Sequence, residues 1–85
     1  MTLIGNKYRE PRSQRMYRST GKIPEIAGGT LENSYWYLSG IIESTFGDEG
    51  ATIADIYHEV TGPKGMSLDD TRYLVNKAVQ EGYLK

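Results

Sequence analysis

The stretch of residues 67–85 constrains the fold of this chain more than any other. Ser67 and Asp70 form a capping-box pattern, in which the serine hydroxyl accepts from a free backbone N–H and the carboxylate lies in the first helical turn. The side chains that then recur at helical spacing are Leu68, Thr71, Leu74, Val75, Ala78 and Val79. Gly82 suits a left-handed stop after the last turn. The stretch therefore predicts an amphipathic helix over 67–81, followed by a short strand at 83–85.

The opposite face of this helix is polar and aromatic. It carries Arg72, Tyr73, Asn76, Lys77 and Gln80. Such side chains can read a groove of DNA, and they also make up ordinary solvated helix faces. Both interpretations stay open at this point.

Size and composition place the chain among small soluble domains. Its 85 residues include no cysteine, so neither disulfides nor zinc thiolates stabilise it. No run approaches the roughly 18 apolar residues of a membrane span, and no signal-peptide core follows Met1. We expect an intracellular protein, cytoplasmic or nucleoid/nuclear, with no membrane partner.

Charge divides the chain into two parts. Residues 1–30 hold six cations and two carboxylates, a net charge of +4, whereas residues 31–85 hold four cations and nine carboxylates, a net charge of −5. The six cations are Lys7, Arg9, Arg12, Arg15, Arg18 and Lys22. This asymmetry predicts a basic arm over 1–29 attached to a compact acidic domain over 30–85.

The arm has prolines, glycines and no sustained helical or strand period, which predicts an extended or disordered segment. Arginines recur every three residues, with Tyr8 and Tyr17 interleaved. Cations of this kind meet phosphates and the rings can stack on bases, so the arm suits a nucleic-acid backbone. A solvated tail is the alternative.

A first helix is predicted over about 31–46, capped by Thr30. Its buried stripe consists of Leu31, Tyr35, Leu38, Ile42 and Phe46. The aromatic cluster 35–37 can be a stacking platform, but we favour core, because a small domain needs its large side chains inside. Gly40 would allow another helix to cross closely.

A second helix is predicted over 52–60, after a very short strand at 51–53. Thr52 and Asp55 repeat the capping-box pattern. The predicted buried face consists of Ile53, Ile56, Tyr57 and Val60. Residues 61–66 form the turn that leads to the third helix.

This order of elements resembles a winged helix-turn-helix domain over about residues 30–85. The resemblance rests on the helix pair 52–60 and 67–81, on the ending AVQEGYLK at 78–85, and on ATI at 51–53, where a first strand would pair with 83–85. The expected fold class is mainly α, a three-helix winged-helix-like domain with a minimal two-stranded β element. The wing hairpin would only begin at Lys85, so the domain is expected to be either wingless or a piece of something longer.

The resemblance implies a recognition helix at 67–81, lying in a major groove of double-stranded DNA. Arg72 would then contact guanine and Asn76 adenine. The side chains expected on phosphates are Lys64, Ser67, Thr71, Tyr73 and Lys77. Asp69 and Asp70 count against this, because they bring negative charge to the DNA-facing end of the helix.

No catalytic constellation is visible. His58 is the only histidine, and it lies off the predicted buried face of its helix. A lone histidine supports neither a nucleophile triad nor a metal site. We therefore expect no enzyme, no metal and no cofactor.

The leading hypothesis is a small DNA-binding module, regulatory (as in transcription) or accessory to a nucleic-acid process. The first alternative is a winged-helix-like protein–protein interaction module. The second is binding of RNA or a ribonucleoprotein through the basic arm.

Overall fold

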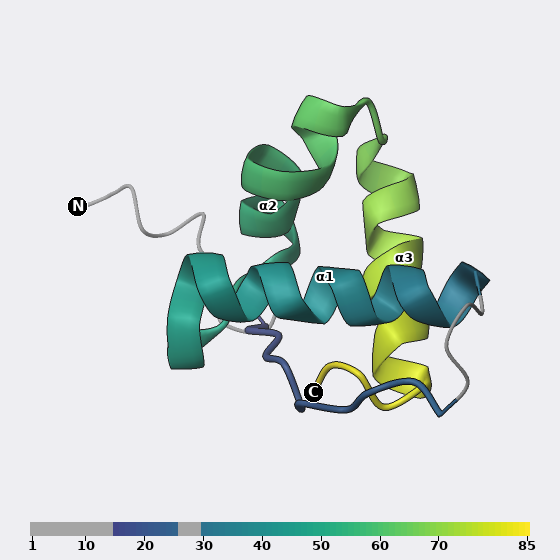
Figure 1. Ribbon diagram of the computed structural model, residues 1–85. Helices are drawn as coiled ribbons and strands as arrows, with labels where there is room; N and C mark the ends of the chain where they lie inside the picture. Colours follow the sequence, from purple (N-terminus) through teal and green to yellow (C-terminus); the bar gives the residue numbers. More distant parts are fainter. Residues whose placement is uncertain (1–14, 26–29) are drawn as a thin grey trace.

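The computed structural model describes residues 15–25 and 30–85, and in this part the protein is mainly helical (Figure 1). Three α-helices are present, as expected: α1 (Thr30–Phe46), α2 (Ile53–Ile56) and α3 (Leu68–Gln80). Short helical turns connect them: η3 (Gly47–Glu49), η4 (Tyr57–Thr61) and η5 (Gly62–Lys64). Both α1 and α2 pack on α3, and Figure 1 shows α1 crossing in front of α3, with α2 above α1 in this view. Among the described residues, no helix is long and apolar enough to cross a membrane.

Helix α1 buries the middle of the stripe that its spacing predicts, while Phe46 is partly buried and the side chain of Leu31 lies outside the described part of the structure. Tyr35, Leu38 and Ile42 are each at most 5% exposed and belong to the core. The aromatic residues beside them do not, since Trp36 is 46% and Tyr37 is 60% exposed. The preference for a buried aromatic cluster is therefore right for Tyr35 and wrong for its two neighbours.

Gly40 lies on the exposed side of α1. A Cβ added there would meet no atom within 4 Å, so no other helix crosses closely at this point. The expectation that Gly40 allows another helix to cross closely is therefore wrong.

The second helix begins as predicted and ends differently. Thr52 Oγ1 accepts from Asp55 N at 3.0 Å, and the Asp55 carboxylate accepts from Thr52 N at 3.2 Å, which completes the capping box. The helix then widens into the π-turn η4, closed by a bond from Gly62 N to Tyr57 O. A Cβ at Gly62 would lie 2.6 Å from that oxygen, so glycine permits the closure. Helical backbone thus runs on to Lys64.

Helix α3 has the predicted start and stop. Ser67 Oγ accepts from Asp70 N at 3.0 Å. At the other end Gly82 has φ of +88°, and the bonds Tyr83 N to Ala78 O and Gly82 N to Val79 O form a Schellman motif. The side chains of this helix that enter the core are Thr71, Val75 and Ala78.

Leu68 departs from the predicted stripe of α3, because its side chain is 41% exposed. It occupies the first position of the helix, before the packed turns begin. The helical period is therefore correct for the interior of α3 and fails at its first residue.

The β element differs from expectation. Isolated bridges join Tyr17 to Ala51 and Ser19 to Leu84, and the described residues contain no longer strand. The segments 51–53 and 83–85 were predicted to pair with each other. Instead, each of them pairs with the segment 17–19. A two-stranded element is not confirmed.

Tyr17 anchors this segment in the domain. Its side chain is 6% exposed and belongs to the core cluster. Gly50 makes room for its backbone, because a Cβ there would meet Tyr17 O, and Gly50 itself has φ of +81°. Backbone hydrogen bonds of residues 17–20 to Ala51, Tyr83 and Lys85 hold this segment on the domain, so Tyr17 is not free to stack on a base.

Candidate nucleic-acid interface

The outer face of α3 presents the two residues predicted to contact bases. Arg72 and Asn76 are both exposed and are one helical turn apart. Tyr73 is next to them and 66% exposed. Asp69 begins the same face one turn earlier. None of these side chains is buried by the described residues 15–25 and 30–85, as a groove-reading helix requires.

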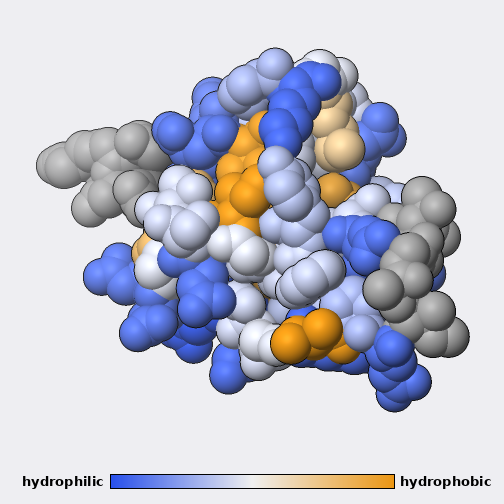
Figure 2. Space-filling view, in the orientation of Figure 1, coloured by the Kyte–Doolittle hydropathy of each residue, from blue (hydrophilic) through white to orange (hydrophobic). Residues whose placement is uncertain are grey.

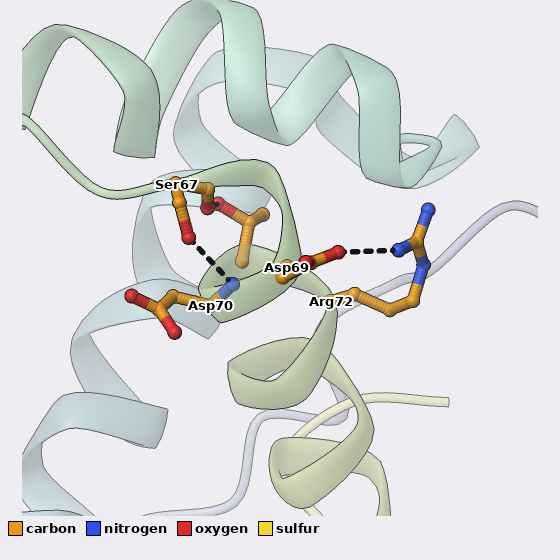
Figure 3. A network of polar contacts seen from close by, with 5 residues as sticks. Ser67, Asp69, Asp70 and Arg72 are labelled. Carbon is orange, nitrogen blue, oxygen red and sulfur yellow. Dashed lines mark hydrogen bonds and ion pairs between the residues drawn. The ribbon is translucent and has the colours of Figure 1, made fainter.

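Arg72 is engaged with Asp69 on this face. Its Nη1 lies 3.2 Å from Asp69 Oδ1, and the side chains are 53% and 94% exposed (Figure 3). A pair this exposed contributes little to stability. It places the guanidinium beside a carboxylate of the first turn of α3, which would repel a phosphate there.

Only the backbone of Asp70 takes part in the N-cap of α3. Its N–H donates to Ser67 Oγ, while its carboxylate points away from Ser67 in Figure 3. Ser67 remains exposed. Ser67 can therefore still reach a phosphate, and the two aspartates leave the start of α3 acidic.

Thr71 is not a surface residue. Its side chain is fully buried, its hydroxyl donates to Ser67 O at 2.8 Å, and Thr61 Oγ1 lies 2.5 Å from it. It cannot contact a phosphate in this arrangement. Its predicted role in binding is replaced by a role in holding the turn before α3.

The two lysines near α3 lie differently from expectation. Lys64 Nζ donates to Tyr37 Oη at 3.1 Å and lies 4.7 Å from the centroid of that ring, so its charge rests on α1. Lys77 is half-buried on α3. The structure thus brings Arg72, Tyr73 and Asn76 together and directs Lys64 elsewhere.

The basic residues of the N-terminal segment fall into two groups. Lys7, Arg9 and Arg12 lie outside the described residues. The described cations are Arg15, Arg18 and Lys22.

Each described cation of this segment has a neighbour in the fold. The Arg15 guanidinium lies 4.7 Å from the ring centroid of Tyr17. Lys22 Nζ donates to Glu81 O at 2.7 Å, where a cation favours the carbonyl end of α3. Arg18 is exposed and exchanges backbone hydrogen bonds with Lys85. Arg15 and Arg18 thus remain candidates for phosphates, and Lys22 acts as a helix cap.

The surroundings of Arg18 are electrostatically mixed. It lines a polar pocket of about 390 Å³ with Lys85, and Glu43 and Asp48 line the same pocket. The carboxylates offset the two cations, so this pocket does not form a purely basic patch.

His58 is exposed, as its position off the buried face predicted. Its ring contacts that of Tyr57, with centroids 5.7 Å apart. Within the described ranges 15–25 and 30–85, no group of three His, Cys, Asp or Glu side chains could hold a metal ion.

Sequence reasoning missed one feature of this region, an apolar groove beside Tyr37 and Lys64. Figure 2 shows apolar side chains gathered over α2, just above α1, but no residue of α2 lines this groove. The sequence indicates this groove only weakly, because its residues come from α1, the turns and α3 and are distant in sequence.

The comparisons with known proteins give no relative for this chain. No protein-family model, no curated protein and no solved structure matches it at a significant level.

Proposed function

We propose that this chain is a small DNA-binding module with a helix-turn-helix architecture, regulatory or accessory to a nucleic-acid process. Helix α3 would lie in the major groove, with Arg72 on guanine and Asn76 on adenine. The observation that carries the proposal is the pairing of these two exposed side chains one turn apart on a helix whose other face is packed.

The connection between α2 and α3 supports this assignment. The turn is short, and the buried hydroxyls of Thr61 and Thr71 meet across it. Buried hydrogen bonds of this kind fix the angle between two helices. A recognition helix held at a fixed angle can dock in one register on a duplex.

Phosphate contacts would come from Tyr73, Ser67 and Lys77 beside α3, and from Arg15 and Arg18. Each phosphate neutralised by a cation contributes about −0.9 to the slope of log affinity against log salt. With Lys22 on α3 and Lys64 on Tyr37, the predicted phosphate-binding cations that remain within the described residues are Arg15, Arg18 and Lys77.

The test is fluorescence anisotropy of a labelled mixed-sequence duplex at two salt concentrations, followed by selection of the preferred site. Arg72→Ala and Asn76→Ala are each expected to lose about 1–3 kcal/mol of binding to the selected site. Arg72→Lys should lose most of that selectivity, because lysine keeps the charge without the bidentate fork. Asn33→Ala, which removes the same amide from α1 and not from α3, is the matched control for Asn76→Ala.

The contribution of the N-terminal segment is tested by deleting residues 1–14, which leaves Tyr17 in the core. A deletion to residue 29 would remove Tyr17 and confuse folding with binding. No binding of the full chain to the duplex at low salt, or unchanged selectivity in Arg72→Ala and Asn76→Ala, would reject the proposal.

A second function is favoured by a separate observation. Trp36, Tyr37 and Tyr73 are 46%, 60% and 66% exposed, and exposed aromatic residues are typical of protein interfaces. A protein–protein interaction module would bind a partner through these rings. Nuclease-resistant co-purification of one partner, lost in Trp36→Ala, together with no affinity for DNA, would support it.

A further inference from the structure

An apolar groove of about 160 Å³ lies where α1, η4 and α3 meet. The apolar side chains that line it are Leu38, Val60, Met66 and Leu74. Tyr37 and Lys64 also line it and are exposed, so they form its outer rim. Neither Arg72 nor Asn76 contributes, so the groove is separate from the proposed base-reading face.

The groove has the size of a single six-membered ring. An apolar cavity of about 150 Å³ in another protein binds benzene, and this groove is of the same volume but opens to solvent. Two of its lining residues favour an aromatic ring in particular. The exposed Tyr37 ring can stack on it, and the Met66 thioether can contact its edge.

The rim of the groove favours a negatively charged ligand. Among the residues that the structure describes, Lys64 is the only charged one that lines the groove, and no carboxylate does. Lys64 Nζ donates to Tyr37 Oη at 3.1 Å, a bond that does not use the tyrosine's own O–H proton. The ammonium and the hydroxyl are therefore two donors beside one opening, suited to the two oxygens of a carboxylate.

From these observations we infer that the groove is a binding site for a small single-ring aromatic carboxylate. The ring enters between Leu38, Val60 and Leu74, and the carboxylate accepts from Lys64 and Tyr37. This inference goes beyond the proposed DNA binding and does not depend on it.

The experiment titrates the full chain with sodium benzoate and follows the methyl NMR signals of Leu38, Val60 and Leu74. We expect saturating shifts at these methyls with a dissociation constant on the order of 1 mM, as suits a fragment in an open groove. Benzylamine, which has the same ring and the opposite charge, should bind at least about 5-fold more weakly.

Two variants separate the carboxylate contact from the ring contact. Lys64→Gln should weaken benzoate about 5-fold and leave the weaker binding of benzyl alcohol unchanged. Lys77→Gln, which removes a lysine that does not line the groove, should change neither. Both positions are at the surface or half-buried, so the variants are expected to fold.

Several results would overturn the inference. One is the absence of saturable shifts at these methyls up to about 20 mM benzoate, well above the expected constant. Another is equal binding of benzoate, benzylamine and benzyl alcohol, which indicates an unselective apolar patch. A third is a shift of the same methyls on dilution without benzoate, which indicates that a second copy covers the groove.

Discussion

The side-chain hydroxyls of Thr61 and Thr71 lie 2.5 Å apart and both residues are buried, one at the end of η4 and the other in the first turns of α3. Thr71 donates its proton to Ser67 O. Because a hydroxyl has one proton, Thr61 must be the donor between the two threonines. The bond therefore has a direction, and the two residues are not equivalent.

This direction predicts unequal costs for two isosteric substitutions. Thr71→Val removes the acceptor of a buried Thr61 hydroxyl and should cost about 1–3 kcal/mol of unfolding free energy. Thr61→Val removes only a donor, and Thr71 keeps its bond to Ser67 O, so the cost should be below about 1 kcal/mol. Urea unfolding measures both. Equal costs, or a larger cost for Thr61→Val, would contradict the assigned direction.

Tyr17 gives a second prediction, because it joins the N-terminal segment to the core. Tyr17→Ala should cost about 3–5 kcal/mol, as is typical of a buried aromatic side chain. In a domain this small such a loss approaches the whole stability. The neighbouring Met16→Ala is the control, since Met16 is 39% exposed and should change stability by less than about 1 kcal/mol.

Circular dichroism against urea compares these two variants with the parent chain. A Tyr17→Ala protein as stable as Met16→Ala would mean that residues 15–20 do not belong to the folded domain in solution.

The predictions that succeeded from sequence are those with local causes. The stripe Tyr35, Leu38 and Ile42 follows from helical spacing, and the caps at Thr52 and Gly82 follow from hydrogen bonds between residues close in sequence. Each requires only that a helix form and bury one face. The outward position of Arg72 and Asn76 follows from the same period.

The failures depend on contacts between distant segments. Nothing local indicates that Tyr17 meets Ala51, because that pairing joins residues 34 positions apart. The argument that a small domain buries its aromatic residues does not say which of three adjacent ones faces inward. Only Tyr35 is in phase with Leu38 and Ile42.

Thr71 illustrates a conflict already visible in the sequence. Its spacing placed it in the buried stripe of the third helix, while the resemblance suggested a phosphate contact. The structure agrees with the spacing. Periodicity within a helix is thus the stronger guide to which of its residues can reach a ligand.

Tyr83 provides a third prediction. Its side chain is fully buried, and its hydroxyl has no hydrogen-bond partner within residues 15–25 and 30–85. Tyr83→Phe should therefore leave stability at neutral pH unchanged or raise it by up to about 1 kcal/mol. A loss of more than about 1 kcal/mol would reveal a partner for the hydroxyl.

The same hydroxyl predicts a pH dependence. Burial raises the pKa of Tyr83 above its ordinary value of 10.0, and the charges of Glu32, Glu81 and Glu25 raise it further. Below the ordinary value the tyrosine is protonated in both the folded and unfolded chain. Above it the unfolded chain loses the proton first, so the unfolding free energy falls as pH rises past about 10.

Urea unfolding of the parent chain and Tyr83→Phe, at about pH 8 and about pH 11, measures this effect. The stability difference between them should shift in favour of the phenylalanine variant at the higher pH. A difference that does not change between the two pH values would show that Tyr83 ionises as easily in the folded state as in the unfolded one.

Asp69 gives the last prediction, which rests on the proposed DNA binding. Its carboxylate is 94% exposed, carries negative charge on the base-reading face and holds Arg72 Nη1 at 3.2 Å. Asp69→Asn removes the repulsion of phosphates and releases the guanidinium, so DNA affinity at low salt should rise by about 3- to 10-fold. The gain should shrink at high salt, because exposed charges are screened. The stability cost should stay below about 1 kcal/mol, since the exposed pair and the helix-end charge are both weak.

Glu49→Gln is the control for this change. It alters net charge equally but lies on η3, after α1 and outside α3. Anisotropy titrations of both variants at two salt concentrations separate a local effect at α3 from a global effect of charge. An equal gain in both variants would mean that only net charge matters. A lower affinity in Asp69→Asn would mean that the Asp69–Arg72 pair positions the guanidinium for its base instead of competing with it.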